Sequence, residues 1–436
     1  MYRLAIIWTA LRASFWFVPY LIVSAFGVLA VVLTALSPAT AQGWIRAAPQ
    51  LFNVGTDGAA DILSTIASSM MSIVGIVFSL TLVALTLASS QYSSRVLRTF
   101  MRNRLTQASI GVFAGLFVYC LIVLRQIRGE GDQSVTAIAV SVALAAAVGA
   151  VVLLIFFIHH IAVSIQASNV LANIARETIA TIEGMYPIGG DRPSCEDKQG
   201  TAPDGRQVLA TTNGYIQSID ETALLRFADR HSVRIDLQRG VGQFVMAETC
   251  LLVLSDAGVL ARHDLHELRA MISISDERTI AQDPAFGIRQ IVDVALKALS
   301  PALNDTTTAV MGLDYLGAIL AALGPRAFPS PCQRVDGIIR LVTVQPDFTV
   351  LVREAFDQIR RSADGNVAII LRIATTLEHL GTLALPADRY HALFEQLDFL
   401  TEFSTRTVPA PADRVDIDNQ LDKVLRSLVA QRATAT

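Results

Sequence analysis

The sequence predicts a mainly α-helical membrane protein: a four-helix transmembrane bundle, then a small β-barrel-like module and a C-terminal soluble helical bundle in the cytoplasm. Two observations support this fold class. Of the 436 residues, 52% are hydrophobic and only 17% are charged, whereas ordinary soluble domains carry about 25% charged residues. The apolar residues are also concentrated in long uncharged stretches near the N-terminus.

Residues 1–160 are predicted to be the transmembrane domain. The uncharged stretches give helices at about 14–37, 62–91, 106–126 and 134–158. A helix needs about 20 mostly apolar residues to cross the hydrocarbon core, and uncharged runs of this length are rare in soluble proteins. The first stretch is too long for a typical signal-peptide core, so we expect it to be retained.

Positive charges in the short loops predict the orientation. Arg3 and Arg12 precede the first stretch, and an arginine cluster lies between the second and the third. Lys and Arg in short loops favour the cytoplasmic side. Both termini are therefore expected in the cytoplasm.

The second stretch carries a stripe of small, weakly polar residues. Its members recur at heptad-like spacing: Thr65, Ser68, Ser72, Gly75, Ser79 and Thr86. Such a face is typical of close packing between membrane helices. It is also typical of a pore, in which several copies line a path with hydroxyl groups.

Three arginines follow the stripe on one helical face, at i, i+3 and i+7: Arg95, Arg98 and Arg102. Just inside the membrane, they can contact anionic lipid headgroups or form a positive ring at an inner pore mouth. They can also serve only to set the topology.

The polar part of the chain is predicted to contain four segments. Residues 161–186 are expected to form a stalk helix, and 187–206, rich in Pro, Gly and charge, a linker. Residues 207–262 read as short strands around one helix, and elements such as GYIQSID look like the flattened barrel of biotinyl/lipoyl-type domains. No lysine occurs in 207–255, so no covalently attached cofactor is expected in this segment. We expect no other cofactor in the chain.

Residues 263–325 are predicted to be helical around the turn Ser300-Pro301-Ala302-Leu303-Asn304-Asp305, and 335–436 to form a helical bundle. Asp283 and Asp305 are expected to begin helices. The densest polar cluster of the chain lies here: Arg278, Asp283, Arg289, Lys297, Asn304 and Asp305. It can enclose an anionic ligand, bind a neighbouring subunit, or simply form a capped helix–turn–helix with surface salt bridges.

Other chemistry finds little support. His263 and His266 have helical metal-ligand spacing, but no Cys and no further His nearby completes a set, so no metal is expected. Phosphate-loop, nucleophile-elbow and zinc-protease motifs are absent, so the chain is not expected to be an enzyme. The net charge of −3 does not suggest a nucleic-acid partner. The four cysteines show no paired spacing, and we expect reduced thiols.

Four segments carry a resemblance to a known family: SSQYSSRVLRTFMRNRLTQ, GVFAGLFVYCLIVLR, GYIQSID and RQIVDVALKALSPALNDTTTA. Along most of its length the chain resembles the bacterial predicted membrane proteins of domain of unknown function 2254 (DUF2254). Members often carry Pro where this chain has Thr306. The resemblance implies a multi-pass protein of the bacterial inner membrane and implies no activity.

The leading hypothesis is an oligomeric ion channel, or another permeation pathway, lined by the second transmembrane helix. The expected partners are membrane lipid, further copies of the chain, and a small ion or anionic ligand. The alternative is a membrane-anchored sensor or scaffold whose cytoplasmic domains bind a ligand or a protein.

Overall fold

The computed structural model describes residues 16–35, 56–91, 104–127, 133–188, 205–255 and 261–434. The chain divides into two compact units, Met1–Asn169 and Val170–Thr436. Each unit is described by itself.

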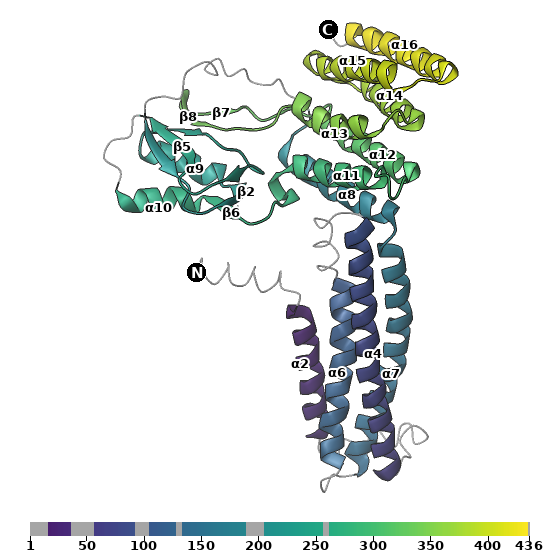
Figure 1. The fold of residues 1–436 in the computed structure, drawn as a ribbon. Helices are drawn as coiled ribbons and strands as arrows, with labels where there is room; N and C mark the ends of the chain where they lie inside the picture. Colours follow the sequence, from purple (N-terminus) through teal and green to yellow (C-terminus); the bar gives the residue numbers. More distant parts are fainter. Residues whose placement is uncertain are drawn as a thin grey trace. The chain divides into compact units, whose positions relative to one another are not determined.

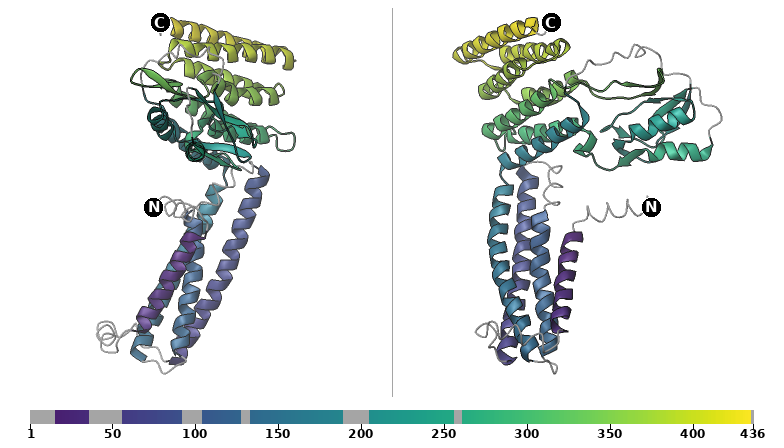
Figure 2. Two further views of the ribbon diagram at one scale, coloured as in Figure 1. Left: turned by 90° about the vertical axis from the view of Figure 1, so that its left-hand side faces the viewer. Right: turned by 180° about the vertical axis from the view of Figure 1, so that it is seen from behind.

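The first unit is built from long apolar helices that run side by side (Figures 1 and 2). They are α2 (Phe17–Thr34), α4 (Thr56–Gln91), α6 (Arg104–Ile127) and α7 (Gln133–Ser164). Both α6 and α7 pack against each of the other three helices, and the contacts of α6 with α2 and α4 are the most extensive. The side chains buried between them are mostly apolar, and the buried polar residues Thr106, Gln107 and Ser109 lie on α6.

Glycines allow α2 and α6 to approach closely. A Cβ atom on Gly111 would lie 3.0 Å from the backbone of α2, and one on Gly115 would lie 2.7 Å from the ring of Phe26. The four-residue spacing puts both glycines on one face, as in small-xxx-small contacts between membrane helices. On the same helix, the Tyr119 hydroxyl donates a hydrogen bond to the Ala139 carbonyl of α7 at 2.8 Å.

A short break separates α7 from α8 (Ala167–Met185). The Asn169 side chain donates to the Val163 carbonyl across this break at 2.8 Å. The single stalk helix predicted over 161–186 is therefore divided between two helices, because an asparagine side chain competes with the helical backbone for its hydrogen bonds.

The second unit contains two β-sheets. Their strands are β1 (Arg206–Leu209), β2 (Gly214–Ile219), β3 (Arg234–Leu237), β4 (Phe244–Val245), β5 (Cys250–Ser255), β6 (Ile272–Ser275), β7 (Cys332–Val335) and β8 (Ile338–Val342). The larger sheet has the order β1-β5-β3-β8-β7 and the smaller β4-β2-β6. Only β3 and β8 pair in parallel among the described pairs.

The barrel-like closure expected for 207–262 is wrong. Both described sheets are open, since the order of each one ends in two different edge strands. A barrel requires its first and last strands to pair. Here the hairpin β7–β8, from much later in the chain, extends the larger sheet instead. Two helices accompany the sheets: α9 (Glu221–Arg230), begun by Asp220 as N-cap, and α10 (Arg262–Ala270).

The remaining helices form one array (Figure 1). They are α11 (Pro284–Ala298), α12 (Thr306–Leu323), α13 (Phe348–Ser362), α14 (Val367–Gly381), α15 (Tyr390–Thr407) and α16 (Pro411–Thr434), with the short 3-10 helices η3 (Ile280–Gln282) and η4 (Ala387–Arg389). Each α-helix of the array packs against the next helix and against the one after it. Alternate helices therefore form two layers, α11-α13-α15 and α12-α14-α16, as in helical-repeat proteins.

The helices predicted in 263–325 and in 335–436 thus belong to the same array. The hairpin β7–β8 is inserted between α12 and α13 and joins the larger sheet. A sequence pattern shows the breaker residues around such an insertion but cannot show that the helices on its two sides pack together.

Five described helices are long and apolar enough to cross a membrane: α2, α4, α6, α7 and α12. The helix α12 is the least apolar of the five, and it packs against α11, α13 and α14. An all-round apolar helix belongs either in a membrane or in a protein core. The neighbours of α12 place it in the core of the array.

One expectation about the cysteines is wrong. Cys332, at the start of β7, forms a disulfide bond, whereas Cys120 and Cys250 are free. Spacing along the chain cannot show which sulfur atoms the fold brings within bonding distance.

Candidate functional site

The small, weakly polar stripe predicted on the second stretch lies on α4, so we call it the α4 stripe. Each of its members is exposed on the first unit. Thr65, Ser68, Ser72, Gly75, Ser79 and Thr86 all face away from the other helices of the bundle. The opposite side of α4 is buried against them through Leu63, Met70, Val77 and Ala84. The stripe therefore takes no part in packing within its own bundle.

Hydroxyl groups of the stripe donate to the helix backbone. Thr65 donates to the Asp61 carbonyl at 2.8 Å, and Thr86 to the Leu82 carbonyl at 2.9 Å. Ser72 donates to the carbonyl of Ser68 at 3.0 Å. A hydroxyl bonded in this way leaves no unsatisfied proton, and its oxygen still accepts a hydrogen bond. Such a face is compatible with a neighbouring helix or with water.

Gly75 has the smallest side chain of the stripe. A Cβ atom built there meets no atom within 4 Å. Space is thus open at the middle of the exposed face, in contrast to Gly115 of α6. The glycine contact of α6 was missed by the sequence analysis, although the pattern Gly-Val-Phe-Ala-Gly at 111–115 was enough to find it.

An acidic residue extends the stripe at its N-terminal end. Asp61 lies four residues before Thr65, on the same helical row, and is exposed, as is Asp57. Neither carboxylate forms an ion pair with another described residue. The predicted arginines Arg95, Arg98 and Arg102 lie outside the described residues.

In the second unit, part of the predicted polar cluster gathers at the start of α11. Two nitrogens of Arg278 donate to Asp283 at 2.9 and 2.8 Å. Asp283 caps α11 by accepting from the Phe286 amide at 3.1 Å, which confirms it as a helix start. Arg278 also lies over the Phe286 ring at 5.0 Å.

The carboxylate of Asp283 is 5% exposed. Burial raises its pKa above the ordinary value, and Arg278 partly offsets that effect. Burial also raises the pKa of nearby Tyr186 to about 12, with the charges of Asp283 and Glu221 adding to the effect.

Arg289 lies one turn further along α11. It pairs with Asp293 at 2.9 Å and with Glu354 of α13 at 3.4 Å. Its charge is engaged within the array, so it offers little to a solute.

The other three residues of the cluster lie at the far end of α11. Lys297, Asn304 and Asp305 are exposed, and 15 helical residues extend over roughly 22 Å. Asp305 caps α12 as expected. It accepts from the Thr308 hydroxyl at 2.6 Å and from the Thr308 amide at 3.0 Å, and these bonds lower the pKa of its carboxyl. The structure therefore does not bring the six residues to a single site.

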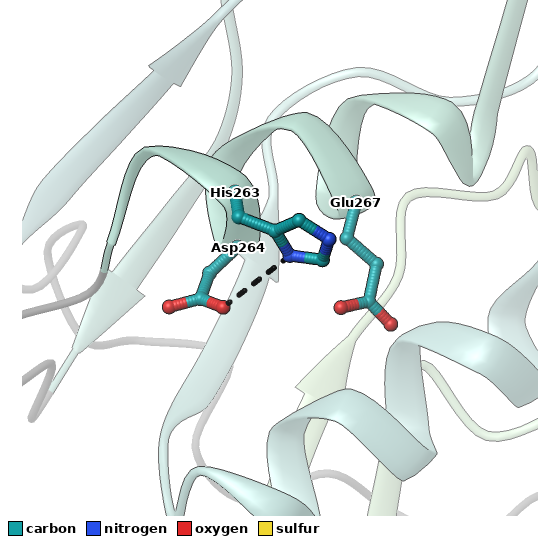
Figure 3. Close-up of side chains that lie close together, drawn as sticks. All are labelled: His263, Asp264 and Glu267. Atoms are coloured by element: carbon teal, nitrogen blue, oxygen red, sulfur yellow. Dashed lines mark ion pairs between the residues drawn. The ribbon is translucent and has the colours of Figure 1, made fainter.

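A third cluster lies on α10. Three side chains place their ligand atoms within 4.8 Å of one another: His263, Asp264 and Glu267 (Figure 3). The His263 side chain is 84% exposed. Asp264 accepts from the Ala261 amide at 2.8 Å, and Glu267 lies 3.5 Å from Arg230. Because both carboxylates have protein partners, we assign no metal to this group, and His266 is not part of it.

A cavity of about 390 Å³ opens beside the C-terminal end of α12. Its wall includes the buried guanidinium of Arg389, which lies over the rings of Phe328 and Phe348 at 4.9 and 5.3 Å. Arg389 donates to main-chain carbonyls at the end of α12. Arg389 therefore satisfies free carbonyl groups at the C-terminal end of α12. No sequence motif predicts this role.

Comparison with known proteins gives one family and a set of relatives. Residues 12–379 match the family described as "Predicted membrane protein (DUF2254)". Uncharacterized proteins of Mycobacterium tuberculosis and Mycobacterium bovis are 30% identical over 373 residues, which is 83% of this chain and 71% of each relative. No solved structure matches.

Proposed function

This chain belongs to the DUF2254 family of predicted membrane proteins, and on that premise we propose that several copies assemble around their α4 helices. The α4 stripe of each copy lines a polar pathway for small ions, and the second unit regulates it. The observation that carries the proposal is the exposure of the whole stripe on its own bundle.

A hydroxyl-bearing face on a membrane helix avoids lipid and seeks either another helix or water. None of the described helices covers the stripe. Another copy is therefore the simplest partner, and a ring of copies brings one stripe from each to a common axis. The oxygens left free to accept hydrogen bonds then face that axis, where they can replace part of an ion's hydration shell.

Charge at the two ends of the stripe bears on ion preference. In a ring of copies, Asp61 forms an acidic ring at one mouth, which favours cations. Arg95, Arg98 and Arg102 form a basic ring near the other mouth, or contact lipid headgroups. We place the α4 N-terminus outside the cell, because the arginine-bearing loop favours the cytoplasm.

The proposal includes the topology. The helices α2, α4, α6 and α7 are the spans, α12 belongs to the array, and both termini lie in the cytoplasm of a bacterial cell with an inner membrane. No enzymatic activity and no nucleic-acid partner are proposed.

The disulfide bond of Cys332 provides a test of that orientation, because cytosolic thiols are kept reduced. If the second unit lies in the cytoplasm, this bond is reduced in intact cells, and a permeant maleimide modifies Cys332 without an added reducing agent. Modification only after a reducing agent is added would place the second unit on the opposite side of the membrane.

A second candidate function is a membrane-anchored sensor or scaffold. The two-layered array α11–α16 favours it, since helical-repeat surfaces commonly bind proteins. In this case α4 serves only in assembly, and the bound partner contacts the second unit.

Ion flux from liposomes containing the purified protein distinguishes the permeation pathway from the sensor or scaffold. The variant Ser72→Leu/Ser79→Leu is compared with the natural chain, with cations and anions tested separately. Ser24→Leu is the matched control, because Ser24 is an exposed serine on α2. We expect flux to be lost in the double variant, which still assembles, and kept in the control. The absence of flux from the natural chain under every salt, pH and voltage tested would instead favour the sensor or scaffold.

A further inference from the structure

The larger sheet carries a polar cluster on the face opposite its apolar core. Its members come from three neighbouring strands: Ser255 on β5, Arg234 and Asp236 on β3, and Arg340 on β8. Ile235, Leu254 and Leu341 belong to the apolar core. Because successive residues of a strand point to opposite faces, the polar residues next to them share the other face.

The strand register sets the polar residues side by side. Arg234 is paired with Ser255 across β3 and β5. The parallel pairing of Ile235 with Leu341 places Arg340 next to Arg234 on the other side. Neighbouring strands lie about 4.8 Å apart, so Arg234 stands between Ser255 and Arg340 on the same face of the sheet.

The cluster has one carboxylate, and Arg234 already engages it. The Nε of Arg234 donates to both oxygens of Asp236, at 3.0 and 3.1 Å. Asp236 is only 6% exposed. Among the described residues it is the acidic group of this face, and its charge is neutralised by its neighbour.

Arg340 and Ser255 have no such partner. The buried Nε of Arg340 and the buried hydroxyl of Ser255 make no hydrogen bond. Ser255 is 8% exposed, so bulk water does not satisfy its hydroxyl. No ion pair of Arg340 is found in the part of the chain that the structure describes.

The unpartnered groups of Arg340 and Ser255 can be satisfied by a single ligand. Arg340 lies beside the Arg234–Asp236 ion pair without an ion pair of its own among the described residues, and buried donors without an acceptor are costly. A water molecule supplies an acceptor but no charge. An oxyanion supplies both, and the guanidinium group matches the geometry of phosphate oxygens.

We propose that this face of the sheet binds a tetrahedral oxyanion, either inorganic phosphate or the phosphate monoester of a small solute. Arg340 Nε and Ser255 Oγ donate hydrogen bonds to its oxygens, and Arg234 adds positive charge while it holds Asp236. The proposal is independent of any role of α4 in the membrane.

Isothermal titration of the purified full-length protein tests this site, with inorganic phosphate and methyl phosphate as separate probes. We expect saturable binding of at least one probe, and the tighter one identifies the source of the phosphate group. Arg340→Gln is expected to weaken binding at least tenfold, and Ser255→Ala about threefold, since a charged donor contributes more than a neutral one.

Two further variants keep the test decisive. Arg340→Lys keeps the charge but removes the Nε donor and the planar fork, so it is expected to fold normally and to bind severalfold more weakly. Arg334→Gln is the matched control, because Arg334 is an exposed arginine on the adjacent strand β7 that bonds to the Gly337 carbonyl. It is expected to bind like the natural chain. Absence of saturable binding of either probe would overturn the proposal, as would binding that Arg340→Gln and Arg334→Gln weaken equally.

Discussion

Two faces made of small residues lie in the same bundle, and only one of them is filled. On α6, Gly111 and Gly115 are pressed against α2, with the Phe26 ring 2.7 Å from the position of a Cβ atom on Gly115. On α4, Gly75 meets nothing within 4 Å, and the hydroxyls on either side of it are exposed. The residue types are alike, and their surroundings are opposite.

Small-residue stripes thus occur in two different surroundings in one bundle. On α6 the stripe brings two helices of one chain together. On α4 the stripe is exposed, and we propose that a ring of further copies covers it. The spacing alone does not separate the two uses, because both give one smooth helical face.

The second unit repeats the contrast at the two ends of α11. Asp283 is buried against Arg278, whereas Asp305 is an exposed cap. The pKa of Asp283 is raised by burial, and that of Asp305 is lowered by its hydrogen bonds. Acid therefore acts on them in opposite directions.

The largest effect is expected for Arg278→Gln. Removing one partner of a buried ion pair leaves the other charge unpaired, at a cost of about 3–5 kcal/mol in the free energy of unfolding at neutral pH. Because the pKa of Asp283 is raised, its protonated form is favoured in the folded state, and the loss shrinks as pH falls through that pKa. Chemical denaturation at several pH values measures this, and a loss independent of pH would contradict it.

Gly115→Leu is expected to come next. Its side chain would overlap Phe26, and overpacking costs about 1–3 kcal/mol. Gly75→Leu is the matched control on α4, with an expected change near zero in the detergent-solubilised monomer. Thermal unfolding of both variants measures the difference. Equal destabilisation by the two variants would contradict the description of a packed face at Gly115 and an open face at Gly75.

A smaller loss is expected for Asp305→Ala, about 1 kcal/mol at neutral pH. The pKa of Asp305 is lowered in the folded state, so the stabilisation is complete above its unfolded pKa and disappears as pH falls through the folded one. Asp305→Asn keeps the capping oxygen and should retain most of the stability. Denaturation curves of the two variants at neutral and acid pH check the direction.

Asp61→Asn is expected to leave stability unchanged, because Asp61 is exposed. If the α4 stripe lines a pathway, removing its terminal charge should lower the preference for cations over anions severalfold. Reversal potentials in planar bilayers measure this preference. A change in total flux without a change in preference would place Asp61 away from the pathway.

Much of the fold follows from the sequence. Uncharged stretches of about 20 residues can be little else than spans or buried helices, and the family assignment confirms a membrane protein. Asp283-Pro284 and Asp305 begin α11 and α12 because a side-chain oxygen there satisfies a free backbone amide. These are local effects, which neighbouring residues determine.

Features that depend on distant parts of the chain were not predictable in this way. The pairing of β8 with β3 joins residues about 100 positions apart and replaces the expected barrel by open sheets. The cluster of 278–305 was expected at one place, but α11 is long enough to keep its ends apart. The α4 stripe is visible in the sequence, whereas the direction that it faces depends on where α6 and α7 pack.

The measurement that tests the central claim most directly is the reactivity of single cysteines along α4 toward a charged, water-soluble thiol reagent. It uses membranes containing a variant without its native cysteines. We predict that cysteines at Ser72 and Ser79 react and reduce ion flux, whereas cysteines at the exposed neighbours Met71 and Phe78 do not react. Protection at Ser72 and Ser79, or equal reactivity at all four positions, would contradict a water-filled pathway along the stripe.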